Sequence, residues 1–151
     1  MALRNIVKDG DPILRKKCRE VTEFNERLNV LLDDMKETLV LANGAGLAAP
    51  QVGVLKRVAI VSVDDAFYEL INPEIIETEG EKISPEGCLS LPGICGTVNR
   101  PYKVTVRAQD RFGKTFTARG EGLLARAFCH EIDHLDGILF EDKIIDYYEE
   151  A

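Results

Sequence analysis

Hydrophobic positions recur at helical spacing in one early segment of the chain. A repeat every three or four residues places these side chains on one face of a helix. Asn25 is suited to cap the start of this helix, and Asn43-Gly44 is suited to end it. We therefore predict a scaffold helix that buries a single apolar stripe. The stripe consists of Leu28, Leu31, Leu32, Met35 and Leu39.

A second helix is predicted in the last third of the sequence, beginning after Gly120 and Gly122. Its apolar residues follow helical spacing and are interspersed with charged ones. Both histidines of the protein fall in this helix, so its polar residues also need an explanation. The predicted apolar side consists of Leu123, Leu124, Ala127, Phe128 and Leu135.

Segments that are rich in β-branched residues, or that alternate between apolar and polar ones, predict strands. A polar loop is expected at 78–82 and a hairpin turn at 110–113. The acidic tail at 146–151 is expected to fray. The predicted strands are 57–63, a second that ends at 70–73, a continuation at Ile75-Ile76, and the hairpin strands 102–108 and 114–119.

Length and composition favour one globular unit. A chain of 151 residues can bury one core but not two, so we expect a single domain spanning residues 1–151. The apolar fraction of 45% and charged fraction of 30% are ordinary for such a domain. With the predicted elements, this indicates an α+β fold in which short, mainly antiparallel sheets pack around the second helix.

Charge and cysteine usage exclude several classes of protein. A net charge of −7 argues against a nucleic-acid partner, because phosphate binding needs a basic surface. The sequence contains no apolar run of membrane-spanning length and no N-terminal signal core, so we expect a cytoplasmic protein unless a removed segment preceded it. Irregular cysteine spacing suggests neither a disulfide framework nor a zinc ribbon. The cysteines are Cys18, Cys88, Cys95 and Cys129.

Small residues dominate the segment from Gly44 to Gln51. Its glycines formally satisfy the dinucleotide pattern G-x-G-x-x-A, but that pattern requires a strand before it and a helix after it. Here a helix precedes the glycines, and Pro50 interrupts the residues after them. A tight connection into the next strand is the better interpretation, although it leaves the polar Gln51 unexplained.

The pentapeptide His130-Glu131-Ile132-Asp133-His134 predicts a metal site. Residues four apart on a helix lie one above the other, so both imidazoles can face one ion. Glu131 lies about 100° around the helix from His130, which places its carboxylate beside the ion as a general base. Two randomly placed histidines fall four apart on the order of once in a hundred sequences, so coincidence is the weaker explanation.

The third ligand has to come from elsewhere in the chain. A metzincin protease would have a third histidine where this chain has Phe140, and few carboxylates remain downstream for a thermolysin-like site. The ligand is therefore a cysteine or a distant carboxylate, with Cys88 and Cys95 as candidates. Spacing does not choose between them, although the loop around Gly87 weakly favours Cys88.

Three motifs, taken together, resemble those of the peptide deformylases. G-x-G-L-A-A-x-Q occurs at 44–51, E-G-C-L-S at 86–90 and H-E-x-D-H at 130–134, in the family's order and with similar separations. Further similarity at 71–74 and 136–137 extends the resemblance over nearly the whole chain.

The resemblance implies that Cys88, His130 and His134 hold one divalent ion, which decides against Cys95. It also implies Fe(II) as the physiological metal, with Zn(II), Ni(II) or Co(II) in purified samples, whereas ligand chemistry alone would favour Zn(II). The implied reaction removes the formyl group from the N-terminal formyl-methionine of new polypeptides and releases formate. In it, Glu131 is the general base and acid on metal-bound water, while the side chain of Gln51 and the backbone N–H of Leu89 stabilise the oxyanion.

The resemblance further implies an extended substrate beside Gly44-Ala45-Gly46 and a methionine pocket at Ala45, Leu123 and Ala127. Glu86 is expected to pair with Arg100 and so hold the metal loop. The implied substrate-binding residues are Gly44, Ala45, Gly46, Glu86, Gly87, Leu123, Arg126 and Ala127.

Two departures from the family bear on substrate and partners. Many members have a bulkier residue where this chain has Ala45, which affects the expected width of the pocket. N-formylmethionyl nascent peptides imply transient proximity to the ribosome, but we do not expect docking through the C-terminal helix that many bacterial members have after the position of Tyr148. The alternatives are a metallopeptidase or other amide hydrolase, and a structural Cys-His-His module closed by Cys95.

Overall fold

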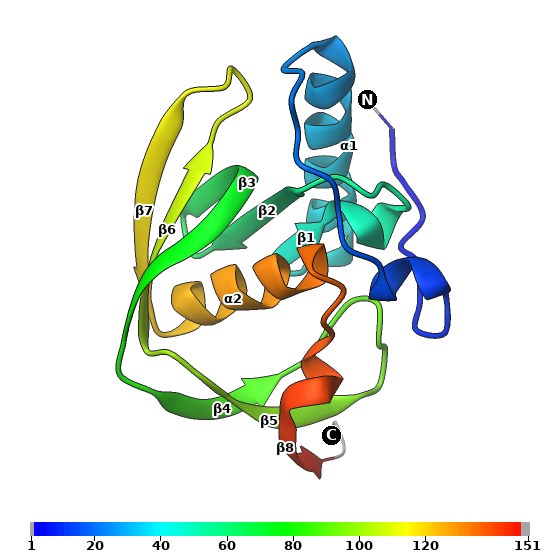
Figure 1. The fold of residues 1–151 in the computed structure, drawn as a ribbon. Helices are drawn as coiled ribbons and strands as arrows, with labels where there is room; N and C mark the ends of the chain where they lie inside the picture. The colour runs from blue at the N-terminus through cyan, green and yellow to red at the C-terminus, as the bar shows by residue number, and fades with distance from the viewer. Residues whose placement is uncertain (1, 149–151) are drawn as a thin grey trace.

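Residues 2–148 are described by a computed structural model, in which two antiparallel sheets enclose a helix (Figure 1). The larger sheet has the strand order β1-β2-β3-β6-β7, and the smaller has the order β4-β5-β8. The larger sheet contains β1 (Gly46–Ala48), β2 (Val58–Val63), β3 (Ala66–Glu79), β6 (Lys103–Gln109) and β7 (Thr115–Glu121). The smaller contains β4 (Lys82–Glu86), β5 (Cys95–Arg100) and β8 (Ile144–Tyr148). The predicted α+β class with antiparallel sheets is confirmed.

The scaffold helix α1 (Glu26–Ala42) forms as the sequence predicts. The side chain of Asn25 accepts a hydrogen bond from the Leu28 N–H, which satisfies one of the free donors at the helix start. Asn43 ends the helix in the left-handed conformation with φ 55°. All five residues of the predicted apolar stripe are buried.

Alternation along β2 places the two helices on opposite faces of the larger sheet. Val58 and Ile60 pack in the same core cluster as the α1 stripe, whereas Val61 and Val63 pack with Phe128. Successive side chains of a strand point to opposite faces, so α1 covers one face and the second helix covers the other.

That second helix, α2 (Leu123–Leu135), lies between the two sheets (Figure 1). Ten of its residues are buried, so it has almost no solvent face. Gly120 allows its close approach to β7, because a Cβ there would lie 2.7 Å from Leu124 Cγ. The prediction that Leu123 belongs to the apolar core side is wrong, since this first helical residue is 60% exposed.

The long strand β3 differs from its prediction. The sequence predicts that a strand ends at 70–73, but β3 continues to Glu79, with a change of register between Ile71 and Glu74. At this bulge Asn72 has φ 51°, and its side chain bonds both the N–H and the C=O of Val21. This contact, which joins residues 51 positions apart, stabilises the bulge next to Pro73, so that the strand continues beyond it. Residues 78 and 79, which the sequence predicts to lie in a loop, therefore belong to β3.

The C-terminal segment also differs from its prediction. Instead of fraying from residue 146, the chain forms β8, which pairs antiparallel with β5. Ile144 packs directly against Gly96, where an added Cβ would lie 2.6 Å from Ile144 Cγ2. This tight contact with β5 orders an acidic segment whose composition suggests no structure. Residues 149–151 lie outside the described part of the chain.

Three short 3-10 helices complete the elements: η1 (Pro12–Arg15), η2 (Ala49–Val52) and η3 (Phe140–Lys143). The turn η2 follows β1 directly and contains Gln51. Within residues 2–148, no helix combines the length and the apolar character needed to cross a membrane.

Candidate metal centre

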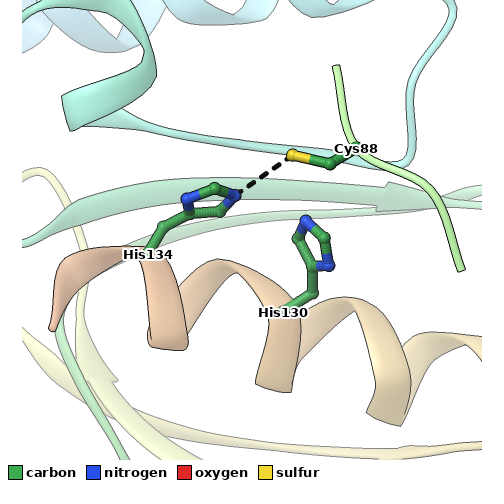
Figure 2. A group of neighbouring side chains, drawn as sticks. All are labelled: Cys88, His130 and His134. Atoms are coloured by element: carbon green, nitrogen blue, oxygen red, sulfur yellow. Dashed lines mark hydrogen bonds between the residues drawn. The ribbon is translucent and has the colours of Figure 1, made fainter. Parts of the chain in front are cut away.

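Cys88, His130 and His134 come together at the centre of the molecule. One ligand atom from each lies within 4.8 Å of the other two, and Cys88 Sγ is 3.4 Å from His134 Nε2. Figure 2 shows both imidazoles rising from α2 toward the cysteine, which comes from the loop between β4 and β5. The four-residue spacing therefore brings the two rings to one point, as predicted.

The structure groups Cys88 with the histidines, and not Cys95. Cys95 is the first residue of β5 and is buried, but it is not part of the three-residue group. The choice that spacing left open therefore falls on Cys88.

This donor set fits a transition metal. A thiolate with two imidazoles suits zinc or iron, and three protein ligands leave a fourth position for the reaction. His134 is 1% exposed, and its Nδ1 has no hydrogen-bond partner within residues 2–148. The Nδ1 of His130, in contrast, lies 2.7 Å from Glu86 Oε1, which fixes the orientation of that ring.

Glu86 is the centre of a buried network of charges. Its carboxylate accepts hydrogen bonds from Arg100 Nη2 at 2.7 Å and from Arg126 Nη1 at 2.7 Å, in addition to its contact with His130. Burial alone would raise the pKa of Glu86, but the hydrogen bonds from His130 and Arg100 hold it well below its usual value. The predicted pair of Glu86 and Arg100 is confirmed.

Asp133 closes this network back onto α2. Its Oδ2 lies 2.6 Å from Arg100 Nη1 and 3.0 Å from Lys143 Nζ. Arg100 therefore bridges Asp133 and Glu86, and Glu86 holds His130 one turn away from Asp133 on the same helix. The sequence patterns predicted no role for Asp133, although its place inside the histidine motif was a signal.

Glu131 points into the remaining space beside the metal ligands. It is 4% exposed, and its Oε1 has no hydrogen-bond partner among the described residues. Oε2 lies against the backbone of β1, where a Cβ on Gly46 would be only 2.6 Å away. Burial raises the pKa of Glu131 to about 7, so this carboxyl is suited to exchange a proton near neutral pH.

Gln51 lies beside the cysteine and is 1% exposed. Its Oε1 accepts a hydrogen bond from the Ala48 N–H at 2.9 Å. Its Nε2 lies 3.1 Å from Ser90 Oγ and 3.7 Å from Cys88 Sγ. The carboxamide is therefore held with its nitrogen toward the cysteine.

A cavity of about 490 Å³ opens beside these groups. All of the substrate-binding residues predicted from the sequence line it, as do Gln51, Leu89 and Glu131. Further lining residues, which the sequence analysis did not assign to substrate binding, come from β4, the loop that carries Cys88 and the start of β5. They are Pro85, Leu91, Pro92, Gly93, Ile94 and Cys95.

A sequence model of the polypeptide deformylase family matches residues 3–149. The chain belongs to this family. A peptide deformylase of Acetivibrio thermocellus is 59% identical over 150 residues, covering 99% of this chain and 88% of that protein. One of Caldicellulosiruptor bescii is also 59% identical over 150 residues, covering 99% of this chain and 90% of its own length.

Solved structures of peptide deformylases share the fold. That of Thermotoga maritima has a TM-score of 0.92 and 40% identity, covering 94% of this chain and 97% of that one. That of Synechococcus elongatus, in complex with actinonin, has a TM-score of 0.91 and 38% identity, covering 95% of this chain and 79% of that one. Polypeptide deformylases depend on a metal, and the Cys/His/His group is a suitable place for one.

Within this deformylase fold, Arg126 makes three hydrogen bonds to other residues of the protein. Its guanidinium donates to Glu86 and to the backbone C=O groups of Val98 and Lys82, and the residue is 6% exposed. Arg126 and Glu86 therefore fix each other in the wall of the cavity.

Proposed function

We propose that the residues around Cys88, His130 and His134 carry out the reaction of the peptide deformylase family. The enzyme removes the formyl group from the N-terminal formyl-methionine of new polypeptides, consuming water and releasing formate and a free amine. The observation that carries the assignment of residues is the buried Glu131, with one carboxylate oxygen unpartnered in the described part, in the same cavity as two of the three candidate metal ligands.

Cys88, His130 and His134 are the ligands in this proposal, and Fe(II) is the physiological metal. Zn(II), Ni(II) and Co(II) suit the same donors and are expected in purified samples. When bound, the cation supplies the Lewis acidity that makes water nucleophilic near neutral pH. The contact of Glu86 with His130 Nδ1 supports this assignment, because it leaves Nε2 of that ring available to the ion.

Glu131 moves the protons of the reaction. It accepts a proton from the attacking water and delivers it to the nitrogen that departs as the C–N bond breaks. A pKa of about 7 supports both roles, because the carboxyl group is then readily protonated and deprotonated at neutral pH. Its position against Gly46 places it beside the strand along which the substrate is expected to lie.

Gln51 and Leu89 bind the oxygen that becomes negative as water adds to the formyl carbon. The proposed donors are Gln51 Nε2 and the backbone N–H of Leu89, and both residues line the cavity. The orientation of the Gln51 carboxamide supports this role, because its oxygen is already bonded to the Ala48 N–H.

The peptide is proposed to add as a strand beside Gly44-Ala45-Gly46. β1 is the edge strand of the larger sheet, so its outer backbone groups face the cavity and can pair with an extended chain. The methionine side chain enters the apolar part of the cavity at Ala45, Leu123 and Ala127.

A nascent chain as substrate places the reaction in the cytoplasm, in transient proximity to the ribosome. Direct binding of nucleic acid is not part of the proposal, since the net charge of −7 disfavours contact with phosphates.

The test is an assay of the protein loaded anaerobically with Fe(II) or Ni(II), using formyl-methionyl peptides and measuring formate. We expect formate from the formylated peptide and none from an acetylated peptide of the same sequence. Cleavage of internal peptide bonds would instead indicate a metallopeptidase. A folded, metal-loaded sample that releases no formate would contradict the proposal.

A further inference from the structure

Ser90 is a buried polar residue outside the cavity. It is 0% exposed and is not among the residues that line the cavity, whereas the neighbouring Cys88 and Leu89 are. A hydroxyl in such a place is costly unless it is hydrogen-bonded. Its oxygen accepts a hydrogen bond from Gln51 Nε2 at 3.1 Å.

Together with the bond from the Ala48 N–H, this bond fixes the orientation of the Gln51 carboxamide. The oxygen of the carboxamide must face the Ala48 N–H, which can only donate, so the opposite orientation would place two donors against each other. The nitrogen has two N–H bonds. With one directed to Ser90 Oγ, the planar geometry of the amide directs the other away from Ser90 and toward Cys88 Sγ, which lies 3.7 Å from Nε2.

The backbone of both residues is tied to one N-terminal segment. The Val7 N–H donates to the Gln51 C=O at 2.7 Å, and the Asp9 N–H donates to the Ser90 C=O at 2.8 Å. Gln51 belongs to η2 and Ser90 to the loop after β4, so two separate parts of the site are held at a set separation. Ser90 is therefore well anchored as an acceptor for the Gln51 side chain.

We propose that Ser90 is a positioning residue for catalysis, acting through Gln51. By accepting one N–H of the carboxamide, Ser90 holds the other beside Cys88 at the cavity, where the oxygen of the formyl group develops negative charge. Ser90 itself touches neither substrate nor metal. The inference rests on the oxyanion role proposed for Gln51.

The experiment is a double-mutant cycle with Ser90→Ala, Gln51→Ala and the combined variant, assayed for formate release as the Fe(II) or Ni(II) forms. We expect Gln51→Ala to lower kcat by about 10²- to 10³-fold, as for loss of an oxyanion donor. Ser90→Ala should lower kcat by about 10-fold with KM nearly unchanged, because misplacement of a catalytic group slows the chemical step. In the Gln51→Ala background, Ser90→Ala should change kcat by less than about 2-fold.

Metal content and thermal unfolding of each variant are measured alongside, with Ser62→Ala on β2 as a matched control away from the cavity. Native activity in Ser90→Ala, with Gln51→Ala impaired, would overturn the inference and leave the proposed function standing. Equal losses in both backgrounds would also overturn it, because Ser90 would then act independently of Gln51. Full activity in Gln51→Ala would instead refute the oxyanion role on which the inference rests.

A measurement on the unaltered protein keeps the inference testable if Ser90→Ala does not fold. The two side-chain N–H protons of Gln51 can be resolved by NMR. We expect one of them to exchange with solvent far more slowly than the amide of a free glutamine. Rapid exchange of both protons would show that the bond to Ser90 does not persist in solution, and would overturn the inference.

Discussion

The two helices of this protein differ in how their most buried polar residues are paired. In α1, Asp34 and Thr38 are buried and both are engaged by the N-terminal segment: the Ala2 N–H donates to Asp34 Oδ1 at 2.7 Å and the Arg4 N–H donates to Thr38 Oγ1 at 3.0 Å. In α2, Glu131 Oε1 and His134 Nδ1 have no partner within residues 2–148. Asn29 Oδ1 on α1 also has no partner in the described part of the chain, but Asn29 is a partly exposed, uncharged residue. The unpartnered atoms of α2 belong to titratable side chains that are at most 4% exposed and lie at the candidate metal centre.

The largest difference between the two helices is expected in kcat, when one carboxylate is removed from α2 and one from α1. Glu131→Ala should lower kcat for formate release by about 10²- to 10⁴-fold, because proton transfer loses its general base and acid. Metal content should stay the same, since Glu131 is not one of the three proposed ligands. Glu37→Ala, at an exposed position of α1, is the control and should retain native kcat. Loss of metal in Glu131→Ala would show that the residue acts as a ligand instead.

A second comparison concerns stability and metal affinity, and sets a charge pair of the buried Glu86 network against a charge pair outside it. Glu86→Gln leaves Arg126 buried without a carboxylate and Arg100 with Asp133 alone, so the free energy of unfolding should fall by about 3–5 kcal/mol. Metal affinity should fall by about 10- to 100-fold, because His130 loses its orienting partner. Denaturant unfolding and metal titration measure these two effects.

Glu69→Gln is the control for this network. Glu69 pairs with Arg111 on the far side of the molecule, and their side chains are 20% and 22% exposed. Its replacement should cost about 1 kcal/mol or less and leave metal affinity unchanged. Equal effects of the two substitutions would contradict the special role of Glu86.

The third contrast separates stability from catalysis. Met35 is 0% exposed on the buried stripe of α1, so Met35→Ala should lower the free energy of unfolding by about 2–5 kcal/mol. Its kcat should remain native at temperatures where the protein is folded, because α1 contributes no residue to the cavity lining. Val40→Ala, at an exposed position of the same helix, should stay within about 0.5 kcal/mol. A fall in kcat for folded Met35→Ala would show that α1 is more than scaffold.

The smallest effect is expected for the dependence of folding stability on acid pH. The hydrogen bond from the Ala2 N–H lowers the pKa of Asp34, with help from Arg4, although burial opposes the shift. A carboxyl with a lowered pKa in the folded state stabilises the protein above its unfolded pKa of about 4, and this contribution is lost as the pH falls through the folded value. Asp34→Asn should therefore show a smaller loss of stability below about pH 4 than the unaltered protein. Parallel pH profiles of the two proteins would contradict this.

Local signals explain what could be predicted of the fold. The stripe and cap of α1 depend on residues close together in the sequence, and they are confirmed. The continuation of β3 past Pro73 depends on Asn72 bonding Val21, and β8 depends on Ile144 fitting over Gly96. Contacts between such distant positions leave no periodic pattern in the sequence.

In the candidate site, too, features that depend on nearby residues could be predicted from the sequence, and features that depend on distant contacts could not. The spacing of His130 and His134 predicted that their rings would meet, and the structure brings them together with Cys88. Spacing did not choose between Cys88 and Cys95, and the family motif was needed for that. The contacts of Asp133 with Arg100 and of Ser90 with Gln51 join segments far apart in the chain, so only the structure reveals them.

The short edge strand β1 also bears on self-association. An unpaired strand edge can recruit the edge of another molecule and so start aggregation. Here the edge is three residues long, Leu47 and Ala48 are 0% exposed, and the loop carrying Cys88 lines the same cavity. A single flexible chain end can enter such a recess, whereas the broad edge of a second folded sheet cannot. The geometry that is proposed to admit one peptide therefore also protects the β1 edge from pairing with the sheet edge of another copy.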